Sequence, residues 1–254
     1  MEFHQLISAI ERHSPDILEE NGDVYFGGKV ALREPNGIAL VGLNPGGIGL
    51  PSIRNNLEIF LKDSGKEYYS GFIDQCWHEP EYSKYETCGL CKLSLISNGI
   101  VHLGRHQKMI LKIAEVCGFD LRKTVAINAI WTQTRTAYDL RLYLRDKGFP
   151  RMEEFFRSKF FPIFQELFRE CRTRLIICLG NGVSESSFSF FRAALKVAVS
   201  DVVNISTDYR DGRYFMATIN GLKTLFFGIP HPSLHTLSDL GMAQLKKCKA
   251  EICI

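Results

Sequence analysis

The sequence contains no hydrophobic run of the roughly 18 residues that a membrane-spanning helix needs. Its opening residues, MEFHQLISAIERHSPDILEE, are charged every few positions and lack the basic start and apolar core of a signal peptide. Several of the 8 cysteines lie in segments patterned as helices or strands, which argues against a disulfide framework. We therefore expect a reduced, cytoplasmic protein that does not contact a membrane.

Internal repeats and low-complexity segments are also absent, and neither sign of charge dominates. The net charge of +3 and the pI of about 8.4 permit a nucleic-acid partner but do not require one. Neither glycine-rich phosphate-binding motif, G-x-G-x-x-G or G-x-x-x-x-G-K-[ST], follows an apolar run. A nucleotide-binding, flavodoxin-like protein is therefore only a weaker alternative.

The chain does contain apolar runs that alternate with segments of helical pattern. Strands are predicted at 37–43, 124–130, 174–180, 213–219 and 222–229, and helices at 2–13, 105–117, 151–170, 183–197 and from Asp239 onward. This alternation predicts an α/β fold, a three-layer α/β/α sandwich with a central, mostly parallel four-stranded sheet. A chain of 254 residues commonly forms one such domain. We expect residues 1–254 to be a single domain and the protein to be a monomer.

The pattern breaks down at about 51–103, which we interpret as an irregular insertion. Within it, Cys88 and Cys91 have the C-x₂-C spacing that places two thiolates on one metal ion, and Cys76 and His78 lie upstream. These residues are candidate ligands of a structural zinc ion. The competing interpretation is that a polar loop has gathered cysteines by chance, because only one C-x₂-C pair is present.

Two short motifs come directly after predicted strands, where parallel sheets carry their functional loops. GLNPGG at 42–47 follows the first strand, and IPHPSLH at 229–235 follows the last. Each motif alone is typical of an ordinary turn. Together, in this order, they are much more specific.

The two motifs resemble those of the uracil-DNA glycosylase superfamily, Gly-x-Asp/Asn-Pro-Gly/Tyr and His-Pro-Ser. The matching residues are Gly42, Asn44, Pro45, Gly46, His231, Pro232 and Ser233. The asparagine makes the first motif most similar to the mismatch-specific and single-strand-selective branches. Residues 104–128 resemble the iron–sulfur branch, in which a Gly-Arg helix precedes a strand ending in a uracil-reading asparagine. No cysteine precedes the first motif as in that branch, so we expect no iron–sulfur cluster.

The resemblance implies a monofunctional DNA glycosylase, which extrudes uracil or a related damaged or modified base and hydrolyses its N-glycosidic bond. Its partner is DNA containing that base, and its location is then the nucleoid, or the nucleus in a eukaryote. This chemistry requires no metal or organic cofactor. The alternative within the superfamily is a DNA-binding member whose catalysis is altered or lost.

The resemblance also assigns roles in catalysis and base recognition. His231 is expected to donate a hydrogen bond to O2 as negative charge develops on the departing base. Asn44 is expected to position the attacking water through its carbonyl oxygen. Asn128 carries both a donor and an acceptor, which suits O4 and N3–H of uracil. Gly42, Pro45 and Gly46 are expected to bring the backbone close to the base, and Gly46 leaves room for bases larger than uracil.

A stacking residue and a wedge complete the expected base site. His102 is the positional candidate to stack on the base, with Tyr69 and Phe72 of the insertion as alternatives. Leu234 or His235 is the candidate wedge that fills the gap left by the extruded base.

Two further residues are candidates for contact with the DNA backbone. Ser233 belongs to the second motif, and Arg135 lies just beyond the second predicted strand. The Gly-Asn-Gly turn at 180–182 is interpreted as plain turn chemistry, with contact to the DNA backbone as the alternative.

Overall fold

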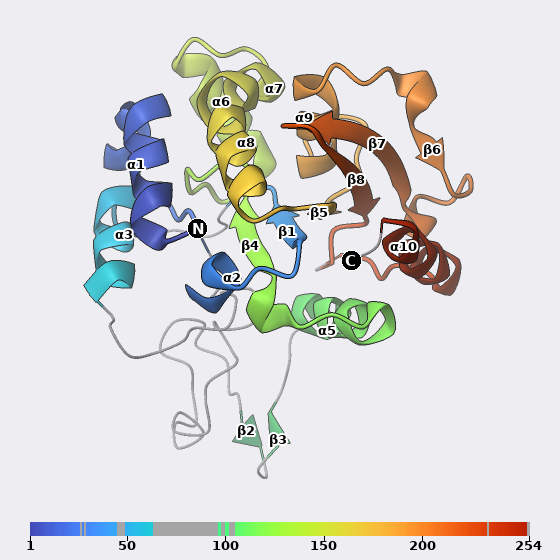
Figure 1. Cartoon of the computed structure of the whole chain (residues 1–254). Coiled ribbons are helices and arrows are strands. Elements are labelled where there is room, and N and C mark those ends of the chain that lie inside the picture. Colours follow the sequence, from blue (N-terminus) through green and yellow to red (C-terminus); the bar gives the residue numbers. More distant parts are fainter. Residues whose placement is uncertain are drawn as a thin grey trace.

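The computed structural model describes residues 1–25, 27, 29–44, 49–62, 96–97, 100–101, 105–232 and 234–252. Its centre is a six-stranded mixed sheet with the strand order β4-β1-β5-β8-β7-β6 (Figure 1). The strands are β1 (Ile38–Gly42), β4 (Val125–Asn128), β5 (Leu175–Leu179), β6 (Val203–Asn204), β7 (Arg213–Ile219) and β8 (Leu222–Ile229). β4, β1, β5 and β8 are parallel, and β7 and β6 continue the sheet antiparallel. β2 (Ile96–Ser97) and β3 (Ile100–Val101) form a separate antiparallel pair.

The three parallel strands β1, β4 and β5 are almost wholly apolar because both faces of the sheet are covered. Every residue of β1, β4 and β5 is buried. Ala39 and Val41 belong to one hydrophobic cluster, whereas Ile38 and Leu40 belong to another. Alternate side chains of a strand point to opposite faces, so the two clusters lie on opposite sides of the sheet.

Helices cover both faces, but unequally. One cluster, which we call the aromatic face, receives residues from α1 (Phe3–His13), α2 (Lys29–Arg33), α3 (Ile53–Lys62), α6 (Ala137–Asp146), α7 (Met152–Phe155), α8 (Phe161–Glu170) and α9 (Ser187–Ala194). The other, the α5 face, is covered by α5 (Arg105–Cys117) and α10 (Asp239–Glu251), which Figure 1 shows apart from α6–α9. Among the helices of the described segments, none combines the length and apolar character that crossing a bilayer requires.

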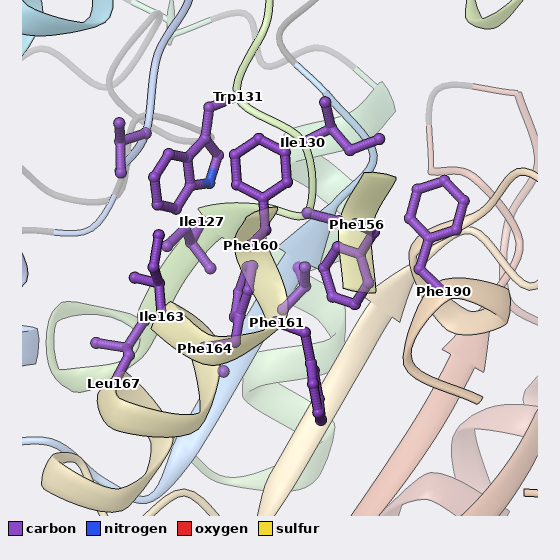
Figure 2. Packing of buried hydrophobic residues seen from close by; sticks show 14 of the residues in the cluster. Ile127, Ile130, Trp131, Phe156, Phe160, Phe161, Ile163, Phe164, Leu167 and Phe190 are labelled. Carbon is purple, nitrogen blue, oxygen red and sulfur yellow. The ribbon is translucent and has the colours of Figure 1, made fainter. Parts of the chain in front are cut away.

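The aromatic face is filled by large rings that pack edge to face. The Trp131 ring lies 4.9 Å from that of Phe160 and 6.5 Å from that of Phe164, between centroids (Figure 2). All three side chains are fully buried. Tilted and edge-on contacts of this kind add stability beyond burial alone. The loop that follows β4 is therefore anchored in the core.

The predicted strands are all present, but the sheet is larger than predicted and mixed. A four-stranded, mostly parallel sheet is expected from the sequence, whereas β7 and β6 extend it to six strands. The cause lies between β7 and β8, where Asn220 and Gly221 have φ angles of 49° and 80°. Asn-Gly in this left-handed conformation makes the two-residue turn of a hairpin, so β7 pairs antiparallel with β8.

Three helices, α2, α3 and α6, lie where the sequence predicts irregular structure or no element. α3 occupies the start of the insertion predicted at 51–103. α6 was not predicted, although Thr136 and Asp139 form a capping box at its start, with Thr136 Oγ1 accepting from Asp139 N at 3.1 Å.

Two predicted helices have different bounds. The single helix expected at 151–170 is divided into α7, a π-helical turn at Phe156–Phe160, and α8. Pro162 has no N–H to continue the regular hydrogen-bond ladder, which accounts for the break. The helix expected at 183–197 is only α9, which begins after Ser186, whose side chain accepts from Ser189 N.

Candidate functional site

The carboxyl edge of the parallel strands is where the connections of the chain diverge. Between β1 and β4 the chain forms α3 on the aromatic face and then α5 on the α5 face, and from β4 it reaches β5 through α6, α7 and α8 on the aromatic face. The loops at the carboxyl ends of parallel strands are where α/β proteins bind ligands. Asn44 follows β1, Asn128 ends β4, and His231 follows β8. The structure thus places all three predicted polar residues at one edge of the sheet.

The amide of Asn44 is held in one orientation by the loop after β4. Its Nδ2 donates to Thr134 Oγ1 at 3.0 Å and to the Thr132 carbonyl at 3.3 Å. Thr134 in turn donates to the carbonyl of Thr136 at 2.9 Å. These hydrogen bonds fix the orientation of the Asn44 side chain at the end of β1.

The backbone of Asn128 is fixed from the aromatic face. Trp131 Nε1 donates to the Asn128 carbonyl at 2.7 Å, and Asn128 is paired in register with Gly42 of β1. The adjacent amide, Ala129 N, donates to the Gly42 carbonyl at 3.0 Å. The backbone at the carboxyl end of β4 is therefore held by hydrogen bonds on both sides.

The side chain of Asn128 points to the other face. Ile127 belongs to the cluster of the aromatic face and Ala126 to that of the α5 face, so alternation puts Asn128 on the α5 side. Only 3% of Asn128 is exposed, yet its Nδ2 has no hydrogen-bond partner among the described residues. A buried donor without an acceptor costs about 1–3 kcal/mol. This amide is therefore suited to a ligand that brings an acceptor.

A second histidine lies beside His231. His106, in the first turn of α5, has its ring centroid 6.0 Å from that of His231, and the rings meet edge to face. Burial, and secondarily the charge of His231, lowers the pKa of His106 to about 4. His231 is an exposed residue overall, but partial removal of its ring from water lowers its pKa as well. Both rings are thus neutral at pH 7, and a neutral imidazole offers one N–H donor.

The loop that carries His231 is closed on itself and tied to α5. The amides of Leu234 and His235 donate to the His231 carbonyl at 2.9 Å and 3.0 Å. Arg105 Nη1 donates to the Leu234 carbonyl at 2.9 Å. The Leu234 side chain is nevertheless 63% exposed, so it projects from an anchored backbone into solvent.

A pocket of about 300 Å³ lies beside His231, between the loops after β1, β5 and β8. We call it the β5–β8 pocket; its lining includes Leu43, Gly180, Ser184, Tyr209, His231 and His235. The rings of Tyr209 and His235 meet edge to face at 5.1 Å. Asn44 and Asn128 do not line this pocket, whereas His231 and Leu43, the neighbour of Asn44, do.

Other predicted site residues lie at the edge or outside the described residues. Gly42 ends β1 beside Asn128, and Arg135 is exposed between β4 and α6. The predicted site residues that lie outside the described residues are Pro45, Gly46, Ser233, His102, Tyr69 and Phe72, together with the candidate zinc ligands Cys76, His78, Cys88 and Cys91.

Cysteines and metal ligands within the described ranges form no cluster. Cys117, Cys171, Cys178 and Cys248 are free and buried, and burial raises the pKa of each thiol. In the part of the chain that the structure describes, no group of three or more His, Cys, Asp or Glu side chains could hold a metal ion. The described thiols are therefore inert core residues.

Sequence reasoning missed His106, Asn181 and Tyr209. Asn181 Nδ2 donates to the Tyr209 carbonyl at 2.7 Å and so ties the loop after β5 to the turn before β7. The Gly-Asn-Gly turn was a signal for this loop, but its partner is distant in sequence. His106 had no local signal, because only the packing of α5 brings it to His231.

No family model, curated protein or solved structure matches this chain.

Proposed function

We propose that this protein is a DNA glycosylase that extrudes uracil, or a closely related base, and hydrolyses its N-glycosidic bond. The observation that carries the proposal is the buried Asn128 amide, whose nitrogen has no acceptor among the described residues. It lies at the same edge as the neutral His231 and the anchored Asn44. The resemblance of 42–47, 104–128 and 229–235 to the glycosylase superfamily assigns the same residues to this chemistry.

Asn128 would recognise the base. Its Nδ2 can donate to O4 of uracil while its Oδ1 accepts from N3–H, so that one amide reads two neighbouring positions. Cytosine presents an amino donor where uracil presents O4, which sets two donors against each other. The hydrogen bond from Trp131 to the Asn128 backbone carbonyl holds the main chain that carries this amide in place before the base arrives. Such preorganisation avoids a cost of ordering the site on binding.

His231 would stabilise the departing base. Cleavage of the glycosidic bond leaves negative charge on the base, mainly on its oxygens, and positive charge on the sugar. A neutral histidine can donate an N–H to O2 as this charge develops, an effect typically of 10²–10³ in rate per donor. The desolvation that lowers the pKa of His231 keeps the ring in that neutral form.

Asn44 would orient the water that attacks the sugar. The motif resemblance assigns this role to its side-chain carbonyl, and the hydrogen bonds from its amide nitrogen to Thr134 and to the Thr132 carbonyl hold the side chain in position. An amide oxygen is a weaker base than a carboxylate, so the water attacks a sugar that has already lost much of its bond to the base. We expect slow turnover from this arrangement.

Leu234 would enter the space that the extruded base vacates. It is a large apolar side chain that is 63% exposed on a loop held by Arg105. Apolar wedges of this kind stabilise an unstacked base step.

The test is excision from short single-stranded and duplex DNA with one central uracil, followed by alkaline cleavage at the abasic site. We expect strand cleavage that depends on both uracil and alkali, because a monofunctional glycosylase leaves the backbone intact. A matched oligonucleotide with cytosine at the same position is the substrate control. Purified wild-type protein that binds DNA but releases no uracil from either substrate would contradict the proposal.

A further inference from the structure

The β5–β8 pocket is next to the proposed catalytic histidine but separate from the asparagines. Its lining includes His231 itself, Tyr209 and His235, and no lysine or arginine among the described residues. Among the described residues that line the pocket, the only carboxylate is that of Glu185, which pairs with Arg141 of α6. A phosphate would find no cation there, whereas an uncharged aromatic ring would meet aromatic and apolar side chains.

Tyr209 provides a fixed platform in this pocket. Its side chain is 47% exposed, while its carbonyl accepts from Asn181. The turn that carries it is closed by Asp208, whose carboxylate accepts from Arg210 N at 2.9 Å and pairs with the Arg210 guanidinium. A half-exposed aromatic ring on an immobile backbone loses little entropy when a base stacks on it.

The covalent continuity of a DNA strand connects this pocket to the proposed reaction. A nucleotide whose base lies against His231 is bonded to neighbours that must leave the site along the surface beside that residue. The pocket is lined by Leu234 as well as by His231, and the exposed side chain of Val183 lies in the loop that contributes Gly182 and Ser184 to it. Aromatic platforms of this type bind bases of any sequence, because every base has a π face.

We infer that the β5–β8 pocket binds the nucleobase adjacent to the extruded one, stacked on Tyr209, so that two consecutive bases of one strand are turned out. This inference rests on the proposed function, since it assigns the neighbour of the excised base. It implies that unpaired DNA is the better substrate, because the adjacent base need not be separated from a partner.

Fluorescence anisotropy with labelled single-stranded DNA tests the inference. The central uracil carries a 2′-fluorinated sugar that resists hydrolysis, and its 5′ or 3′ neighbour is either a normal nucleotide or a baseless tetrahydrofuran. For one of the two sides, we expect removal of the neighbouring base to weaken wild-type binding about 5- to 100-fold. Tyr209→Ala should lose the same factor on intact DNA and be insensitive to the baseless neighbour. Tyr209→Phe should behave as wild type.

Tyr138→Ala is the matched control, because Tyr138 is a 59% exposed aromatic residue on α6 that does not line the pocket. It should retain the full sensitivity to the missing base. Equal binding of all oligonucleotides by wild type, or an undiminished effect of the missing base in Tyr209→Ala, would overturn the inference. If wild type still excises uracil in that case, the proposed function stands without this pocket. A wild-type protein that neither excises uracil nor binds DNA overturns both.

Discussion

The two faces of the sheet differ in composition and in what they contribute. Within the described residues, the aromatic face is packed with phenylalanines around Trp131 and receives seven helices, whereas the α5 face has mostly aliphatic packing under two. The polar groups of the candidate site, Asn128 and the pair His106–His231, lie at the edge of the α5 face. Asn128 connects the two faces: its backbone carbonyl accepts a hydrogen bond from Trp131 of the aromatic face, while its side chain points to the α5 face. The heavily packed face immobilises the backbone, and the thinner face presents the chemistry.

If this division holds, the largest effect on stability comes from the aromatic face. Phe164→Ala removes a fully buried ring between Trp131 and Phe191 and should lower the free energy of unfolding by about 3–5 kcal/mol. Urea titration measures this loss, and excision by the folded fraction should stay near the wild-type rate. Ile110→Val, in the core of the α5 face, should cost only about 0.5–1.5 kcal/mol. Similar losses at the two positions would mean that the faces do not differ in this way.

The converse effect is expected at His231. His231→Ala should reduce single-turnover excision about 100-fold or more, because the donor meets charge that exists only in the transition state. DNA affinity and the midpoint of thermal unfolding should hardly change, since the residue is exposed and phosphate contacts supply most of the affinity. His4→Ala, an exposed histidine on α1, is the control. Full activity of His231→Ala would show that the last motif is not catalytic.

Asn128→Asp tests whether the Asn128 side chain, on the α5 face, recognises the base. A carboxylate cannot donate to O4, so uracil excision should fall roughly 10- to 100-fold, while cytosine becomes a better substrate through its amino group. Single-turnover rates on the two substrates measure the change in preference. Asn204→Asp, an exposed asparagine on β6, should change neither rate. If Asn128→Asp excises uracil at the wild-type rate, Asn128 does not contact the base.

The smallest expected effect is the dependence of stability on pH at the edge of the α5 face. The folded-state pKa of His106, about 4, lies below its usual 6.5, so the unfolded chain binds a proton that the folded chain does not. The contribution of His106 to stability is complete above pH 6.5 and is lost as the pH falls from 6.5 to 4. We expect a loss of about 1–2 kcal/mol, less than the full shift because the residue is only partly buried.

His106→Phe keeps a ring at this position without the titration. Urea titrations at several pH values between 4 and 7 should show a flatter dependence for this variant than for wild type. An identical slope in both proteins would contradict the burial of a neutral His106. NMR titration of the imidazole resonances of wild-type protein gives the folded-state pKa values of His106 and His231 directly.

Local patterns in the sequence predicted most of the elements but not their full arrangement. The apolar runs around β1, β4 and β5 are continuous because both faces are buried, and this requirement is visible in the residues themselves. Gly118, with a φ of 65°, ends α5, and Ser238 caps α10 by accepting from Gly241 N. The antiparallel direction of β7 was missed although Asn220-Gly221 marks the hairpin.

Within the site, local pattern was enough to place Asn44, Asn128 and His231 at strand ends, because strand termini follow from the limits of an apolar run. Which groups meet there depends on packing between distant segments. The contact between His106 and His231 spans α5 and the loop after β8, and that between Tyr209 and His235 spans two distant loops. Packing likewise leaves the Asn128 amide nitrogen buried without a partner among the residues that the structure describes. Such contacts depend on helix position and sheet order, which pair residues far apart in sequence, whereas local pattern reports only what neighbouring residues need.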